Sequence, residues 1–235
     1  MERESQSSAA TCLIVIGMAG SGKTTFVRQL DKFYTENSKS SPLLANLDPA
    51  VSFIPYAPEI DIRKKYNYKD VMKNYGLGPN GAIMTSLNLF STSADEFANE
   101  IEKKSKDKEI VIVDTPGQIE VFTWSASGVI IAKTLSVTIP TALVFVIDIH
   151  RCENPNSFIS NMLFCCSILY RLKLPMILVF NKCDVSKPDK VKGWLADYNN
   201  YCEDIQQDDS YLSTLSRSLA LALDDYYQDL NAVFV

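Results

Sequence analysis

The sequence predicts an α/β fold: one three-layer domain in which helices cover both faces of a mainly parallel sheet. Short runs of consecutive apolar residues alternate with longer segments of helical periodicity, and strands buried on both faces are apolar throughout. The 235 residues suffice for one large domain with a buried core and are too few for two ordinary domains and a linker. We expect a disordered tail at residues 1–10, rich in Ser and Glu, and a single domain at residues 11–235.

The strands are predicted where uninterrupted apolar runs occur, and several of these runs end in polar residues. Ligands bind at the carboxyl ends of the strands in a parallel sheet, so these polar residues are candidates for a site. The expected strands are residues 12–16, 42–47, 110–113, 142–147, 176–180 and 232–235.

The helices are predicted where apolar residues recur at three- and four-residue spacing, between polar, charged or Gly/Pro-containing breaks. The helix at residues 155–172 is apolar on more than one side, which indicates either the core or a subunit interface. The expected helices are residues 24–34, 61–74, 82–102, 119–133, 155–172, 187–202 and 211–229.

Composition and charge narrow the classes of function. The net charge of −5 argues against nucleic acid as a direct partner. The 6 cysteines show no C-x-x-C spacing and are expected to be reduced thiols of a cytosolic or nuclear protein. The polar start has no signal-peptide pattern, and Lys133 and Pro140 interrupt the apolar region at residues 128–149, so we expect no membrane span.

The segment at residues 13–25, LIVIGMAGSGKTT, joins a buried strand to a glycine-rich turn and a helix start. Its spacing fits G-x-x-x-x-G-K-[ST], the P-loop, in which backbone N–H groups and the helix N-terminus cradle phosphates. Lys23 is expected to contact the β- and γ-phosphates, and the Thr24 hydroxyl is expected to ligate Mg²⁺. The predicted phosphate-binding residues are Gly20, Ser21, Gly22, Lys23, Thr24 and Thr25.

Further acidic and amide side chains follow two of the predicted strands. Asp114 begins Asp114-Thr115-Pro116-Gly117-Gln118 and is expected to hold Mg²⁺ together with Thr24, directly or through water. Gly117 is expected to sense the γ-phosphate, and Gln118 to orient the attacking water unless it only solvates a helix start. Asp48 has two equally weighted interpretations, the handling of water at the metal and a turn aspartate before proline.

The segment Asn181-Lys182-Cys183-Asp184 predicts the choice of base. A carboxylate at Asp184 can accept from the ring N–H and the exocyclic amine of guanine, whereas adenine presents an acceptor there. We expect Lys182 to lie over the base and Asn181 to tie this segment to the P-loop. Together with Cys183 these residues form the predicted base-binding segment.

The stretch Gly78-Pro79-Asn80-Gly81 has the residues of a simple turn. A resemblance adds a second interpretation. The segments GMAGSGKTTF, NLDPAV, GPNGAI, DTPGQIEVFTWSASG and FNKCD together resemble the GPN-loop GTPases, and within them the first eukaryotic paralogue, which is associated with RNA polymerase II. The likeness runs from about residue 11 to residue 235.

The resemblance implies a dimer, in which the loop of Gly78, Pro79 and Asn80 reaches the nucleotide of the partner chain. The partner would be a second copy, as in archaea, or a sister paralogue, as is thought for eukaryotes. The implied role is assembly and nuclear import of RNA polymerase II, with the protein cytoplasmic and shuttling to the nucleus. In the family a serine-containing loop near the guanine, a helix and an acidic tail follow the strand matching residues 232–235, so this chain is expected to be truncated.

The predicted function is slow hydrolysis of GTP to GDP and phosphate, with Mg²⁺ as cofactor and a catalytic step that depends on the dimer. Asp48, Asn80, Asp114 and Gln118 are the predicted catalytic residues. Two other functions remain open. One is a nucleotide-binding adaptor without turnover, and the other is an ATPase of the related dimeric P-loop class, which the base-binding segment disfavours.

Overall fold

The computed structural model describes residues 10–38, 40–205, 214, 216, 218–220 and 230–235. Contacts divide the chain into two compact units, the first of which holds the described residues up to Ala19 together with Lys23–Leu143. The second unit holds Gly20–Gly22 and the described part of Val144–Val235. The single domain expected at residues 11–235 stays a prediction, and the two units are described in turn.

The first unit is built on a parallel sheet with strand order β3-β2-β4-β1. Its register aligns Asp114 with Asn46 and with Val15, and Asn46 with Asp61. The polar residues at the strand ends therefore lie along one edge. The strands are β1 Thr11–Gly17, β2 Leu43–Asn46, β3 Ile60–Asp61, β4 Ile110–Asp114, and the start of β5 Thr141–Asp148, which continues into the second unit.

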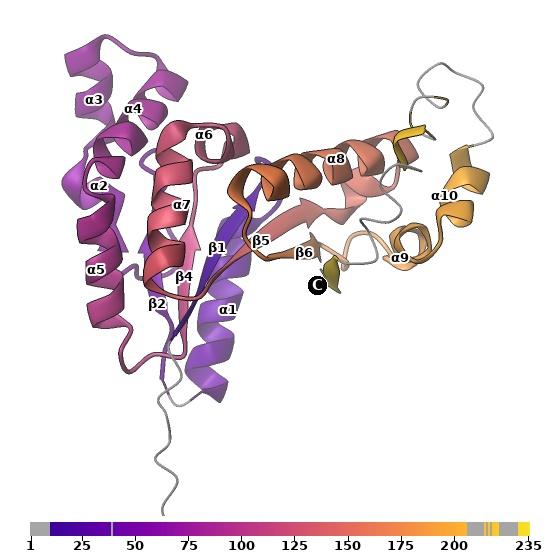
Figure 1. Ribbon diagram of the computed structural model, residues 1–235, viewed down its shortest axis with the longest axis horizontal. Coiled ribbons are helices and arrows are strands. Elements are labelled where there is room, and N and C mark those ends of the chain that lie inside the picture. The colour runs from indigo at the N-terminus through magenta and orange to yellow at the C-terminus, as the bar shows by residue number, and fades with distance from the viewer. Residues whose placement is uncertain (1–9, 39, 206–213, 215, 217, 221–229) are drawn as a thin grey trace, which may run out of the picture. The chain divides into compact units, whose positions relative to one another are not determined.

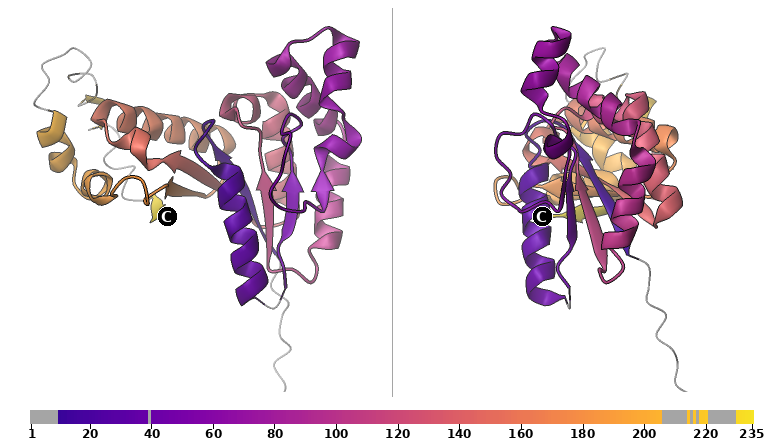
Figure 2. Two further views of the ribbon diagram at one scale, coloured as in Figure 1. Left: turned by 180° about the vertical axis from the view of Figure 1, so that it is seen from behind. Right: turned by 90° about the vertical axis from the view of Figure 1, so that its left-hand side faces the viewer.

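Helices cover this sheet on both faces, as the sequence predicts. In Figure 1, α5 and α7 lie side by side along one face, and the right-hand view of Figure 2 shows α1 on the other face. The helices of the first unit are α1 Lys23–Asn37, α2 Ile62–Lys65, α3 Tyr68–Tyr75, α4 Pro79–Ser91, α5 Ala94–Lys104, α6 Ile119–Thr123 and α7 Ala126–Thr138.

Some predicted helices are wrong in extent, because polar side chains bond to the backbone and end the helix where periodicity continues. The helix expected at residues 61–74 is two helices: the side chains of Asp61 and Asn67 accept from the N–H groups of Arg63 and Lys69 and cap α2 and α3. The helix expected at residues 82–102 is broken at residues 92–93, where the hydroxyls of Thr92 and Ser93 donate to carbonyls in the last turn of α4. The helix expected at residues 119–133 is broken at residues 124–125, where the Ser125 side chain accepts from the Gly128 N–H and caps α7.

The simple turn expected at residues 78–81 is also wrong. Gly78 is the residue before α4, and Pro79 is the first residue of that helix, where its missing N–H costs nothing because the first N–H groups of a helix have no partner within it. Asn80 therefore lies in the first helical turn of α4.

The second unit continues β5 and adds β6 Met176–Asn181 and β7 Asn231–Phe234, with strand order β5-β6-β7. Figure 1 shows α8 Pro155–Leu172 lying along β5 and β6. Its buried side chains include Phe158, which packs against Trp194 at a ring-centroid distance of 5.2 Å, so at least one face of α8 belongs to the core of this unit. The remaining elements are the 3₁₀ helix η1 Ile149–Cys152, α9 Asp189–Ala196 and α10 Tyr198–Ile205.

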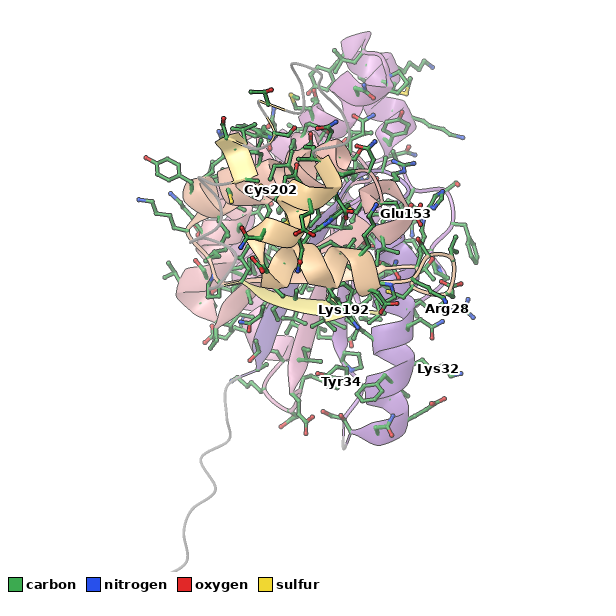
Figure 3. The ribbon with its side chains drawn as sticks, turned by 90° about the vertical axis from the view of Figure 1, so that its right-hand side faces the viewer. Arg28, Lys32, Tyr34, Glu153, Lys192 and Cys202 are labelled. Atoms are coloured by element: carbon green, nitrogen blue, oxygen red, sulfur yellow. The ribbon has the colours of Figure 1, made fainter. Side chains whose placement is uncertain are left out.

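The last strand pairs with β6 through its backbone and through aromatic packing. The ring of Phe234 stacks on Phe180 at 5.0 Å, and the ammonium group of Lys192, labelled in Figure 3, lies 4.9 Å from the Phe234 ring centroid. The helix expected at residues 187–202 is split at Asp197, and most of that expected at 211–229 lies outside the described residues. Among the helices that the structure describes, none has the length and apolar character needed to cross a membrane.

Candidate functional site

Lys23 begins α1 directly after β1 and the glycine-rich turn, and its side chain is nearly enclosed, with 5% exposed. Its Nζ donates to the carbonyl oxygens of Gly17 at 2.8 Å, Met18 at 3.1 Å and Gly117 at 3.4 Å. Burial lowers the pKa of the ammonium group, and the nearby carboxylates of Asp114 and Asp48 oppose that change. The Lys23 side chain thus places its amino group next to the predicted phosphate loop.

Asp114 is the last residue of β4 and is 2% exposed. Its Oδ2 accepts from the Tyr56 hydroxyl at 2.9 Å, while Oδ1 is buried and has no hydrogen-bond partner among the described residues. Burial raises the pKa of this carboxyl to about 6, although the hydrogen bond from Tyr56, the nearby Thr24 hydroxyl and the charge of Lys23 act in the opposite direction. The predicted metal residues Thr24 and Asp114 are therefore neighbours.

Asp48 joins the turn after β2 to the segment that follows Asp114. Its Oδ1 accepts from the Ala50 N–H at 2.9 Å, the contact of a turn aspartate, and its Oδ2 accepts from the Gly117 N–H at 3.2 Å. Burial raises the pKa of the Asp48 carboxyl. The turn interpretation is confirmed, and the contact with Gly117 places the same carboxylate beside the predicted phosphate-sensing glycine.

The two remaining predicted catalytic side chains contact each other. The Gln118 amide nitrogen donates to Asn80 Oδ1 at 2.9 Å, which connects the start of α4 to the start of α6 within one chain. Asn80 is exposed. The expectation that Asn80 acts on a partner's nucleotide stays a prediction, since this contact lies within the first unit.

In the second unit, Asn181 and Lys182 hold the residues Gly20–Gly22. The Asn181 amide donates to the Ser21 carbonyl at 2.9 Å, which confirms the predicted tie to the P-loop, and Lys182 Nζ donates to the Gly20 carbonyl at 2.8 Å. Gly22 has φ +92°, and a Cβ there would lie 2.5 Å from the Asn181 amide nitrogen. Only glycine fits at position 22, because it tolerates a positive φ and has no Cβ to collide with Asn181.

The other predicted base-binding and phosphate-binding residues are more open to solvent. Asp184 is exposed and makes no hydrogen bond or ion pair to any residue that the structure describes, so its carboxylate oxygens are available to a ligand. The Cys183 N–H donates to the Val235 carbonyl at 2.9 Å and so supports the segment rather than the ligand. Thr25 is exposed on the first turn of α1.

Comparison with known proteins identifies the family. A family model described as "Conserved hypothetical ATP binding protein" matches residues 15–235. GPN-loop GTPase 1 of Dictyostelium discoideum is 49% identical over 95% of this chain and 56% of its own length. A GPN-loop GTPase of Pyrococcus abyssi is 32% identical over 82% of this chain and 74% of its own length. This chain belongs to the GPN-loop GTPase family.

Further comparisons support the predicted fold class and the likeness to the first paralogue. The crystal structure of a Pyrococcus abyssi GTPase in its apo form matches with a TM-score of 0.84 and 27% identity, covering 97% of this chain and 91% of that one. It confirms the predicted α/β class. GPN-loop GTPase 1 of Saccharomyces cerevisiae is 47% identical, so the likeness to the first paralogue is confirmed, although this chain spans only 60% of that protein.

Two contacts in this GPN-loop GTPase were not predicted. Tyr56 was missed because nothing in the residues around it points to Asp114, 58 positions away. Asp148 directly follows the strand expected at residues 142–147, and its Oδ2 accepts from Lys182 Nζ at 2.6 Å and lies 3.8 Å from Arg151 Nε. The position of Asp148 at a strand end was the available signal.

The oxygen atoms near Lys23 fit a magnesium ion that is shared with a nucleotide. Among the described residues no group of three or more His, Cys, Asp or Glu could hold a metal by itself. Mg²⁺ usually takes one or two protein oxygens and completes its shell with water and phosphate. In this GPN-loop GTPase the Thr24 hydroxyl and the unpartnered Oδ1 of Asp114 are oxygens of that kind.

Proposed function

We propose that this chain binds GTP together with Mg²⁺ and slowly hydrolyses it to GDP and phosphate. The observation that carries the proposal is the enclosed cation of Lys23 beside the buried, half-unpartnered carboxylate of Asp114. Such a pair suits a ligand that brings phosphate to the cation and a metal to the carboxylate. The relatives are named GPN-loop GTPases, which supports the choice of GTP over ATP.

Each residue near Lys23 would have a separate role in GTP hydrolysis. Lys23 would exchange its carbonyl contacts for phosphate oxygens, and the Gly117 N–H would pass from Asp48 to the γ-phosphate. Asp48, released from that contact, and Gln118 would orient a water molecule. The water oxygen forms the new bond to the γ-phosphorus as the bond to the β-γ bridging oxygen breaks. Mg²⁺, held by Thr24 and Asp114, would neutralise charge on the phosphates.

A single-turnover assay with purified protein tests this function. We expect conversion of bound GTP to GDP and phosphate, and we expect GTP to displace a fluorescent nucleotide at lower concentration than ATP. Binding without conversion would leave the adaptor function as the better description. Displacement by ATP at the lower concentration would favour an ATPase.

Replacing Lys23 by Ala should weaken GTP binding by at least about 1.5 kcal/mol, roughly tenfold, because a charge-assisted contact to phosphate is lost. The dissociation constant from equilibrium titration measures this. Lys32→Ala is the matched control, because Lys32 is exposed on α1 and lies only 3.9 Å from Glu36 in a surface ion pair. Equal dissociation constants for the two variants would contradict the role of Lys23.

Replacing Asp184 by Asn should shift the preference from GTP toward xanthosine triphosphate. The amide offers a donor where the carboxylate had an acceptor, and xanthine carries a carbonyl where guanine carries the amine. Losing one charge-assisted hydrogen bond predicts a change of about tenfold or more in the ratio of the two affinities. Competition binding measures the ratio, and Asp189→Asn, at the start of α9, is the control. An unchanged ratio would show that Asp184 does not read the base.

We also propose that the active form is a dimer, with itself or with a sister paralogue, and that Asn80 acts on the partner's nucleotide. The support is the GPN segment at the start of α4 and the family resemblance. From the same resemblance we propose a role in assembly and nuclear import of RNA polymerase II, with shuttling between cytoplasm and nucleus. Native mass measurement and capture of polymerase subunits by the purified dimer test these two proposals.

A further inference from the structure

Tyr56 lies in the segment between β2 and β3 and is 8% exposed. Its hydroxyl donates to Asp114 Oδ2 at 2.9 Å, and both atoms are buried. A buried tyrosine hydroxyl usually finds a partner, and a backbone carbonyl would suffice for that purpose. Here the partner is instead the buried carboxylate of Asp114, to which we assign the magnesium ion.

The contact distinguishes the two carboxylate oxygens of Asp114. Oδ2 accepts from Tyr56, whereas Oδ1 has no hydrogen-bond partner among the described residues. A carboxylate without such a contact can rotate about its terminal torsion, which is broad and roughly two-fold. The Tyr56 hydroxyl therefore selects one orientation of the Asp114 side chain.

The segment that carries Tyr56 is itself anchored by a partly buried polar network. Arg63 donates to the Val51 carbonyl at 3.0 Å and forms a two-point contact with Asp61, with its closest approach 2.7 Å. Asn46 donates to Asp61 at 2.9 Å and to the Asp48 carbonyl at 3.1 Å. The backbone on the N-terminal side of Tyr56 is thus held at Asp48 and Val51.

We propose that Tyr56 is a positioning residue for magnesium: it holds Asp114 Oδ2 so that Oδ1 faces the ion that arrives with the nucleotide. This inference rests on the proposed function. Partners that orient a metal-binding side chain typically change metal affinity 10- to 100-fold when they are removed. Tyr56 belongs to that class of residue, although it touches neither metal nor nucleotide.

The test measures how magnesium strengthens nucleotide binding. The affinity for a slowly hydrolysed fluorescent GTP analogue is determined over a series of Mg²⁺ concentrations that starts in EDTA, and the midpoint of the Mg²⁺ effect is read for each protein. Tyr56→Phe keeps the ring and removes only the hydroxyl. We expect it to raise the Mg²⁺ midpoint about tenfold.

Tyr66→Phe is the matched control. Its hydroxyl donates to the Leu89 carbonyl at 3.0 Å, so the same atom is removed from a hydrogen bond that has no carboxylate. We expect the Mg²⁺ midpoint of this control to equal that of the unsubstituted chain. Equal midpoints for Tyr56→Phe and Tyr66→Phe would overturn the assignment. Absence of analogue binding by the unsubstituted chain at every Mg²⁺ concentration would overturn the proposed function, and this inference with it.

A double-mutant cycle tests whether Tyr56 acts through Asp114. Asp114→Asn should itself raise the Mg²⁺ midpoint, and adding Tyr56→Phe to it should raise the midpoint no further. A second increase of the same size in the double variant would show that Tyr56 acts independently of Asp114, which overturns the proposal. Circular dichroism of each variant confirms that the fold is retained, and Asp114→Asn with Tyr56 intact supplies a comparison that does not depend on the folding of Tyr56→Phe.

Discussion

Asn80→Ala is expected to lower GTP turnover about 100-fold while leaving GTP binding intact. An amide that donates to charge developing on the transferred phosphoryl group contributes this much when it is preorganised. A turn residue or an ordinary surface residue would cost only about 1 kcal/mol of stability and would not change catalysis. Asn88→Ala, on the exposed face of the same helix α4, is the control, and single-turnover rates at saturating GTP measure the effect.

A mixed dimer distinguishes action on the partner from action within one chain. One chain carries Asn80→Ala and the other Lys23→Ala, so at a GTP concentration between their two dissociation constants mainly the first chain binds GTP, and it receives an intact Asn80 from its partner. We expect one active site in this dimer although neither variant is active with itself. Asn80 accepts from Gln118 of its own chain at 2.9 Å, and this contact would explain a result in which Asn80 acts within its own chain. No recovery of activity in a confirmed dimer would mean that Asn80 works in its own chain.

Gly128→Ala is expected to destabilise the protein by about 3 kcal/mol, the upper part of the range for overpacking a core. A Cβ at Gly128, near the start of α7, would lie 1.8 Å from the Phe122 carbonyl oxygen, and that backbone atom belongs to α6 and cannot move alone. Urea unfolding followed by circular dichroism measures the change.

Gly193→Ala is expected to change the stability of the protein in the opposite direction from Gly128→Ala. Gly193 lies inside α9, where the nearest atom to an added Cβ is the Asn200 side-chain nitrogen at 3.9 Å. Alanine in an open helical position is expected to stabilise by about 0.5 to 1 kcal/mol. If both variants shifted stability in the same direction, the close approach of α6 and α7 would not be the cause of the loss at Gly128.

Those parts of the site that depend on local spacing could be predicted from the sequence. Lys23 and Thr24 follow the glycine-rich turn directly, Asp114 ends an apolar run, and Asn181 follows another, so each position is set by its immediate neighbours. The parallel register then brings the ends of β1, β2 and β4 to one edge without further information.

The contact of Asn181 with the P-loop was predicted from a motif, but contacts between distant segments that no motif indicates could not be predicted. Tyr56 reaches Asp114 across 58 positions, and nothing near Tyr56 in the sequence indicates which residue it meets. The strand β3 has 2 residues, too short to show a pattern, yet its Asp61 binds both Asn46 and Arg63. The break before α3 had a local signal in Asn67, which is a good capping residue. The prediction missed this break because the apolar spacing continues through Asn67.

The hydrogen bonds from Asn181 and Lys182 to the P-loop carbonyls determine how the peptide dipoles of the loop are oriented. In a trans peptide the carbonyl and the following N–H point to opposite sides. Side chains that draw the carbonyls of Gly20 and Ser21 toward β6 therefore turn the N–H groups of Ser21 and Gly22 the other way. The two residues at the end of β6 that we predict to bind the base thus also orient the N–H groups of neighbouring peptide units, so that the loop offers donors to an anion.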